Sequence, residues 1–423
     1  MITFVINYIL EDTKKYEYRG RCPLKGQINC LSSGKEKRKK SSLVELIYLL
    51  MSSIISNYKL VKGPVYSHCY SQDRTLLAIT YDTDCLVYRI SGGKPQLVAT
   101  LPDHDKTVTA VDISIHGRIV TCSQDRNAIV WEPLSDGTYK PTLVLLRINR
   151  AATCVKWAGN GYKFAVGSSA RIIAVCYYER ENDWWVSKHV KKPIRSTINC
   201  IDWHQNGVLL AAGGTDGYVR VFSGFIKGLD TKEQVAGSPW GEKFPFGSLL
   251  REYYQGSWIH DVKWRSSVEK LAYVAHDASL TISDYQGNST AVESPEGLPY
   301  RALCWVNDHE IVCGGYSCHP VLFTEGSQGW SFSKNIDKAS SSATPTTSIA
   351  GDDEEEGNTS FGISALRKFK ELDLKGKVTA QDNGLGTTHQ NAIVGLLPYA
   401  ESSGTVTQVS SCALDGKVIL YNV

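Results

Sequence analysis

Methionine and catalytic signatures are what this sequence most plainly lacks. It has two Met among 423 residues, and about one residue in ten is aromatic. Many Gly, Ser, Val and Ile residues are present instead, which favours strands and tight turns over a helical bundle. There is no phosphate-binding loop, no Ser–His–Asp arrangement and no HExxH run. These absences argue against an enzyme.

A strong excess of charge is also missing, because the formal net charge is only +3. Residues 1–62 hold twelve Lys and Arg against five Asp and Glu, so the rest of the chain is mildly acidic. A nucleic-acid-binding domain would need a strong positive field over its main body. An RNA-binding role is therefore the weakest of the functions considered.

The twelve Cys residues are scattered rather than grouped. The closest pairs, Cys22 with Cys30 and Cys313 with Cys318, lack the spacing of a zinc site, so we expect no metal. Several others fall within apolar, strand-like runs and are interpreted as reduced core thiols of a cytoplasmic protein. These are Cys69, Cys122, Cys154, Cys176, Cys200, Cys304 and Cys412.

What the sequence does have is an internal repeat. A run such as "VTAVDI" (108–113) or "INCIDW" (198–203) occurs seven times, and most copies are followed by a second apolar run, a tight turn and a third run. Apolar residues alternate with period two, which predicts strands. One turn position recurs at spacings of 43, 45, 46, 61, 40 and 98 residues. Four of these spacings match one four-stranded propeller blade.

This pattern resembles the WD-repeat family, whose fold is an all-β propeller. The most complete copy is the second, where His104, Asp125 and Trp131 occupy the positions of that family's hydrogen-bonded His, Asp and Trp. In other copies Phe222, Ser283 or Tyr421 replaces the Trp, and Ala170 or Ser317 replaces the Asp. An Asp at the same turn of successive blades is expected to satisfy backbone N–H groups, not to act in acid–base catalysis. We therefore predict no catalytic residues and no cofactor.

Longer, irregular stretches are similar to one family within the WD-repeat class, subunit one of the actin-related protein 2/3 complex. They are "KPTLVLLRINRAATCVKW" (140–157), "ENDWWVSKHVKKPIRSTINCIDWH" (181–204), "PWGEKFPFG" (239–247) and "HPVLF" (319–323). The resemblance implies a noncatalytic subunit that supports nucleation of branched actin filaments in the cytoplasm. The implied partners are actin-related proteins, small companion subunits and the actin filament.

The sequence predicts one seven-bladed propeller over residues 57–423, with insertions at about 224–256 and 333–388. Because the chain stops after the third strand of the last blade, a strand at 56–63 is expected to close the ring. Residues 1–56 form an extension without a counterpart in the family and are expected to be poorly ordered. Its basic run (35–40) and 13-residue apolar run (43–55) are too short to span a bilayer, so membrane contact is possible only at 35–55.

The second insertion contains an acidic, polar stretch (340–360), which is expected to be disordered, and then a predicted amphipathic helix. Leu366, Phe369 and Leu372 share its apolar side, and Arg367 lies on the opposite side. Such a short helix needs a surface to dock on. It either packs on the propeller or binds a partner, and the resemblance favours contact with actin or an actin-related protein.

A second candidate surface is "ENDWWVSKHVKKPIRST" (181–197). Trp184 and Trp185 should point to opposite faces of a strand, which leaves one of them near the surface. Lys191, Lys192 and Arg195 follow, and an exposed Trp beside basic residues is typical of an interface. The alternative is that both Trp pack between blades.

Two functions of different kinds remain after these steps. The first is an interaction subunit of the actin nucleator, and the second is a WD-repeat substrate adaptor of another assembly, such as a ubiquitin ligase. Co-purifying proteins would distinguish them.

Overall fold

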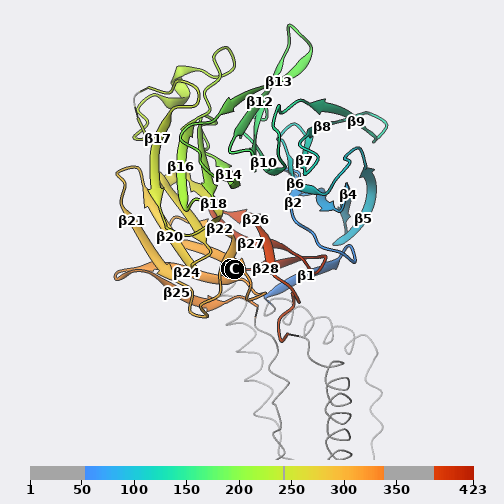
Figure 1. Cartoon of the computed structure of the whole chain (residues 1–423). Helices are drawn as coiled ribbons and strands as arrows, with labels where there is room; N and C mark the ends of the chain where they lie inside the picture. The colour runs from blue at the N-terminus through green and yellow to red at the C-terminus, as the bar shows by residue number, and fades with distance from the viewer. Residues whose placement is uncertain (1–52, 242, 338–384) are drawn as a thin grey trace, which may run out of the picture. The chain divides into compact units, whose positions relative to one another are not determined.

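The computed structural model describes residues 53–241, 243–337 and 385–423. The described residues lie in one compact unit, Ser52–Val423. They form seven four-stranded antiparallel sheets, arranged as propeller blades around a channel (Figure 1). The only helices among them are two short 3-10 turns, η1 (Lys232–Val235) and η2 (Ser266–Val268), so none has the length or apolar character to cross a bilayer. The predicted all-β, seven-bladed fold is confirmed.

Blades 1 to 6 are each built from four strands that follow one another in the chain, from the channel outwards. Blade 1 contains β2 (His68–Tyr70), β3 (Leu76–Tyr81), β4 (Asp84–Ser91) and β5 (Lys94–Leu101). Blade 2 contains β6 (Val108–Ile113), β7 (Ile119–Ser123), β8 (Ala128–Pro133) and β9 (Tyr139–Val144). Blade 3 contains β10 (Ala152–Trp157), β11 (Lys163–Ser168), β12 (Ile173–Glu179) and β13 (Trp184–Val190). Blade 4 contains β14 (Ile198–Trp203), β15 (Leu209–Gly214), β16 (Tyr218–Ser223) and β17 (Leu249–Tyr254). Blade 5 contains β18 (Ile259–Arg265), β19 (Lys270–Ala275), β20 (Ser279–Asp284) and β21 (Ser289–Glu293). Blade 6 contains β22 (Tyr300–Asn307), β23 (Glu310–Gly315), β24 (Val321–Gly326) and β25 (Gly329–Asn335).

Blade 7 combines two distant parts of the chain. Its inner strands are β26 (Ile393–Ser402), β27 (Thr405–Ala413) and β28 (Lys417–Asn422), and its outermost strand is β1 (Ile54–Lys59). Ile54 pairs with Tyr421 and Lys59 pairs with Lys417. The closing strand therefore overlaps the predicted segment, 56–63, but begins two residues before it and ends at Lys59.

The core lies between neighbouring blades. The second strands β7 and β15 are buried along their whole length, whereas the outer strand β5 is mostly exposed. Blades approach so closely that small residues are required at some contacts. A Cβ added to Gly213 would lie 2.4 Å from Cγ2 of Ile259 in the next blade and 2.6 Å from Sγ of Cys200. These close contacts explain why Gly interrupts otherwise apolar strands.

Carboxylates on innermost strands link neighbouring blades. Oδ2 of Asp112 accepts a hydrogen bond of 2.7 Å from the backbone N–H of Trp157 in the next blade. Asp202 accepts the same bond from Trp264 at 2.9 Å. Asp261 accepts it from the backbone of blade 6. These three carboxylates therefore help to hold the ring together.

The connection between β16 and β17 is the long insertion of blade 4, and it covers residues 224–248. The sequence analysis assigned 224–256 to this insertion, which was wrong for its last part, because residues 249–254 form β17. This outer strand alternates poorly between buried and exposed positions, so its pattern resembles a loop. Lys163 of blade 3 anchors the insertion through a fully buried ion pair with Asp230.

Candidate interaction surfaces and the central channel

A hydrogen-bonded network in blade 2 joins two connections, which carry His104 and Asp125, to strands β7 and β8. Nδ1 of His104 lies 2.7 Å from Oδ2 of Asp125, and Nε2 lies 2.8 Å from Oγ1 of Thr121. The indole N–H of Trp131 donates to the same hydroxyl at 3.0 Å. The three sequence-predicted residues therefore meet through Thr121, which the sequence analysis did not single out. The side chains of His104 and Asp125 are almost fully buried, so the network holds the connections and strands of the blade together.

A second network of this kind occurs in blade 7, and the sequence analysis missed it. His389 lies 3.2 Å from the carboxylate of Asp415 and 2.7 Å from Oγ of Ser411. Although burial opposes ionisation, the hydrogen bond from His389 holds the pKa of Asp415 below its usual range. The signal was available in part, because a His precedes the turn Asp in both blades. It was obscured because Tyr421 replaces the Trp.

A group of basic residues lies at one end of blades 2–4. They lie in the connections that lead into an innermost strand or join the second strand to the third, and antiparallel pairing places all these connections on one face. We call them the basic surface: Lys106, Arg126, Arg147, Arg150, Arg171, Lys191, Lys192 and Arg195.

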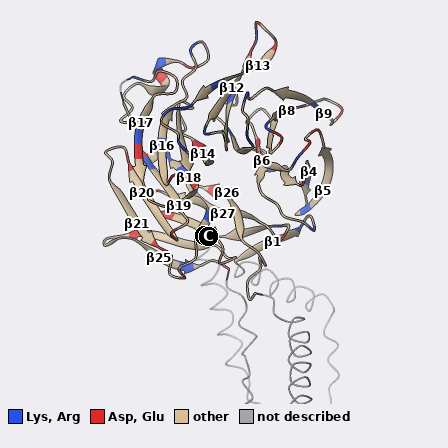
Figure 2. Ribbon diagram, viewed as in Figure 1, with Lys and Arg blue, Asp and Glu red and all other residues tan. Residues whose placement is uncertain are grey.

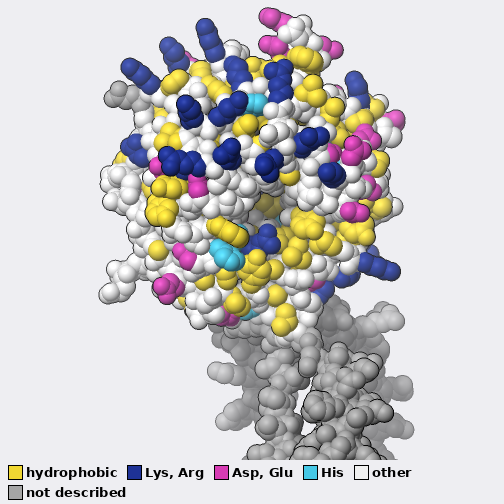
Figure 3. Space-filling view, viewed as in Figure 1, with side chains coloured by type: hydrophobic (Ala, Val, Ile, Leu, Met, Phe, Trp, Pro, Cys, Tyr) yellow, Lys and Arg dark blue, Asp and Glu magenta, His cyan; other side chains and the backbone are white. Residues whose placement is uncertain are grey.

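All eight side chains of the basic surface are exposed, and within the described residues none forms an ion pair. In the same connections the exposed carboxylates are Asp103 and Asp105, while Asp125 is held by His104. Lys and Arg can be followed along the ribbon in Figure 2, and they gather over the upper part of the face seen in Figure 3. Unpaired charge of one sign at this density produces a positive field directed at solvent.

The predicted tryptophan pair lies at the start of β13, at the opposite end of that strand from the basic surface. Trp184 pairs with Glu179 at the end of β12, whereas Val190, which leads into Lys191, pairs with Ile173 at the start of β12. The side chain of Trp184 is 51% exposed and that of Trp185 is 5% exposed, so one points to solvent and the other into the blade. Trp185 packs edge-on against Trp157, with 5.8 Å between ring centroids. Only Trp184 is therefore available to a partner, and Trp185 contributes through packing.

The predicted helix residues Leu366, Arg367, Phe369 and Leu372 lie outside the described residues, and so does the extension before residue 53.

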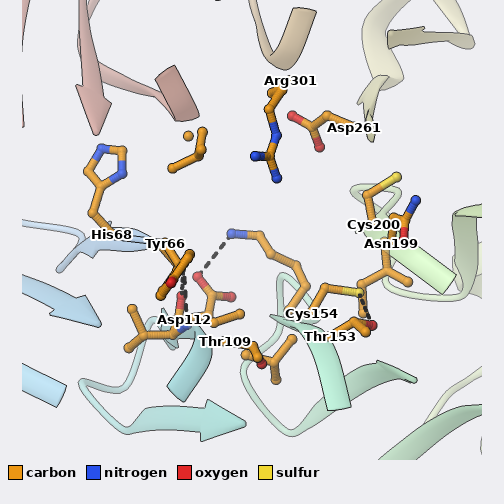
Figure 4. A pocket seen from close by; sticks show the side chains of 18 of the residues that line it. Tyr66, His68, Thr109, Asp112, Thr153, Cys154, Asn199, Cys200, Asp261 and Arg301 are labelled. Carbon is orange, nitrogen blue, oxygen red and sulfur yellow. Dashed lines mark hydrogen bonds and ion pairs between the residues drawn. The ribbon is translucent and has the colours of Figure 1, made fainter. Parts of the chain in front are cut away.

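A channel with a volume of about 390 Å³ passes between the innermost strands. Figure 4 shows its polar lining, including Asp112, Asp261 and Arg301. Lys156 forms an ion pair of 2.9 Å with Asp112, and Lys263 forms one of 2.9 Å with Asp261. Side chains alternate between the two faces of each innermost strand. These four charged side chains line the channel, while the apolar residues between them face the neighbouring blades.

Two imidazoles that line the channel are held neutral. Burial, followed by the charges of His389 and Lys156, lowers the pKa of His68 to about 3. Burial, followed by the charges of Arg301 and His276, lowers the pKa of His260 to about 4. Within the described part of the chain no three His, Cys, Asp or Glu side chains are grouped as metal ligands would be.

Comparisons with known proteins agree with this architecture. A family model described as "WD domain, G-beta repeat" matches residues 95–132 and 187–223. "Actin-related protein 2/3 complex subunit 1" of Saccharomyces cerevisiae is 70% identical over 377 residues, which cover 88% of this chain and 98% of that protein. The protein of the same name from Schizosaccharomyces pombe is 44% identical over 85% of this chain and 97% of that protein. "Actin-related protein 2/3 complex subunit 1A-B" of Xenopus laevis is 38% identical over 87% of this chain and 96% of that protein.

Proposed function

The chain belongs to the family of subunit 1 of the actin-related protein 2/3 complex, and from this membership we propose that it is a noncatalytic interaction subunit of such a complex. In this role it supports nucleation of branched actin filaments and works in the cytoplasm at the actin cytoskeleton. Its partners are actin-related proteins and small companion subunits. The observation that carries the proposal is 70% identity to a curated subunit 1 over nearly that protein's whole length.

The basic surface supports an interaction role. Eight exposed, unpaired Lys and Arg side chains on one face favour a partner whose facing surface is acidic. Contacts of this kind raise association rates and select partners more than they raise affinity, and salt weakens them. Trp184, at the other end of β13, supplies an exposed aromatic ring, the type of side chain that most often anchors an interface, and is a separate candidate contact.

The helix predicted at 365–372 is proposed as a second contact, with actin or an actin-related protein. Leu366 and Phe369 are its apolar anchors, Leu372 extends the same side, and Arg367 lies on the solvent side. Binding through so few apolar residues is weak by itself. It becomes effective when the propeller is already held in the complex, because the local concentration of the helix is then high.

Co-purification tests the assembly role. The full-length chain, tagged and expressed in its natural cell, should recover actin-related proteins in amounts comparable to its own. Recovery of cullin-type proteins in their place would support the adaptor alternative and refute the proposal. Migration of the native protein as a monomer would refute it as well.

Charge reversal tests the basic surface. The variant Lys191→Glu/Lys192→Glu/Arg195→Glu changes the net charge by six units at exposed positions, so the propeller should remain folded. We expect recovery of partner subunits to fall. Raised salt should lower the recovery by the unchanged protein but should affect the variant less, because the attraction that salt screens has been removed. A matched control, Lys94→Glu/Lys140→Glu/Lys227→Glu, makes the same change at exposed positions outside the basic surface. Equal losses in both variants would show that total charge matters, not this surface.

A further inference from the structure

The channel walls carry three cationic side chains and two carboxylates. Lys156, Lys263 and Arg301 extend from the innermost strands of blades 3, 5 and 6. The carboxylates are Asp112 and Asp261. One cation is therefore in excess along the lining. Asp202 lies nearby but does not line the channel, and burial raises its pKa.

The acceptor atoms of both lining carboxylates are already occupied by the protein. Oδ1 of Asp112 accepts from Lys156 at 2.9 Å and from the thiol of Cys69 at 3.1 Å, and Oδ2 accepts from the backbone of Trp157. Asp261 is bound in a similar way by Lys263 and by the backbone N–H groups of Val262 and Leu303. These carboxylates therefore have little capacity left for a further donor.

The donors, in contrast, are in surplus. Each Lys ammonium has three donors, and one of them is used by its carboxylate. Within the described part of the chain the guanidinium of Arg301 forms no hydrogen bond or ion pair, and it lies over Tyr316 with 5.9 Å to the ring centroid. Figure 4 shows this guanidinium directed into the channel. The guanidinium has five donors in a planar fork, and the part of it that faces the cavity is available to an acceptor.

We propose that the central channel is a binding site for a small phosphate-class oxyanion, with Arg301 as its principal ligand. A phosphate group offers only acceptors and matches the planar fork of Arg with two parallel hydrogen bonds. Lys156 of blade 3 and Lys263 of blade 5 add positive charge to the channel while they retain their carboxylate partners. The volume of about 390 Å³ lies at the lower end of the range for small-molecule sites, which suits a compact anion. Neutral His260 beside Arg301 avoids a competing positive charge but leaves the wall polar.

This site does not depend on the proposed role in actin assembly, because it uses the channel and not the outer surfaces. Isothermal titration of the full-length chain with inorganic phosphate, and separately with tripolyphosphate, tests it at an ionic strength held constant with sodium chloride. We expect saturable binding of one anion per chain. The Arg301→Gln variant should bind more weakly, with a dissociation constant raised by about tenfold, which is the scale of one charged bidentate contact.

Arg171→Gln is the matched control, because Arg171 is an exposed, unpaired Arg of the basic surface and does not line the channel. It should bind both anions as the unchanged protein does. Equal weakening by the two variants would show that the anions gather on the basic surface and would overturn the proposal. Absence of saturable binding, or an unchanged dissociation constant in Arg301→Gln, would overturn it too. If Arg301→Gln does not fold, Arg301→Lys keeps the charge but loses the fork, and an unchanged dissociation constant in that variant counts against the site.

Discussion

Replacement of Lys163 by Met should destabilise the propeller strongly, because it breaks a buried ion pair. The side chains of Lys163 and Asp230 are both fully buried. Nζ of Lys163 also donates to the carbonyl of Gly224 at 2.9 Å and lies 5.1 Å from the ring centroid of Trp203. Removal of one partner from such a pair leaves an uncompensated buried charge, which costs about 3–5 kcal/mol. That is a large part of the roughly 5–15 kcal/mol by which domains are stable.

The cost should come from the Asp230 carboxylate left behind and not from loss of a strong attraction. Burial lowers the pKa of Lys163 even though Asp230 raises it, so desolvation outweighs the attraction between the two charges. The double variant Lys163→Met/Asp230→Asn removes both charges while an amide oxygen can still accept the N–H of Ile226, a bond of 2.7 Å in the present structure. It should therefore recover about 1–3 kcal/mol relative to Lys163→Met alone.

Urea unfolding followed by tryptophan fluorescence measures these free energies, and Trp203 reports from the site itself. Lys227→Met is the control, because it makes the same replacement at an exposed position of the same insertion and should change stability by less than about 0.5 kcal/mol. A loss below about 1 kcal/mol in Lys163→Met would refute the reasoning. So would a double variant whose loss equals the sum of the single losses.

Three further outcomes are expected. Deletion of residues 1–50 should leave the melting temperature nearly unchanged, whereas deletion of 1–63 removes β1 and should lower it markedly; equal melting temperatures would contradict closure by this strand. Because the pKa of His68 is about 3 in the folded chain and near 6.5 when unfolded, the unfolded state binds the extra proton, so stability should fall as pH drops below about 6.5, by up to about 1.4 kcal/mol per pH unit. His68→Gln should flatten that dependence in pH-dependent urea titrations, and an unchanged slope would exclude His68 as its source. Leu366→Ser/Phe369→Ser should keep the melting temperature and the assembly of the complex but lower branch formation; a less stable propeller would instead show that the helix packs on its own blade.

The blades could be predicted from the sequence because period-two alternation is a local property. Every innermost strand reads as an apolar run that ends in a large residue, and tight turns with Asp or Gly separate the next strands. The same local rule assigned opposite faces to Trp184 and Trp185, and their exposures differ as expected. Strand β17 was missed because most of its residues face solvent or the insertion, which removes the apolar alternation.

Contacts between distant residues were beyond sequence reasoning. Lys163 and Asp230 are 67 residues apart, and a Lys inside an apolar strand gives no sign of its partner. The channel donors come from separate blades, so their convergence depends on ring geometry. The basic surface is an intermediate case: Lys191, Lys192 and Arg195 were identified from one segment, but the Arg residues of other connections join them only after folding.

The seventh blade has a consequence for how the protein can be made. Its outermost strand is among the first described parts of the chain to leave the ribosome, and the strand it pairs with is among the last, since Nζ of Lys59 donates to the carbonyl of Asp415 across 356 residues of sequence. Until β28 has been synthesised, β1 has no partner strand and presents an open edge, the kind of edge that recruits other strands. Closure of such a long loop is slow relative to formation of local hairpins. The nascent chain is therefore expected to need protection at this edge, and a message truncated before β28 would yield an open ring whose first strand remains unpaired.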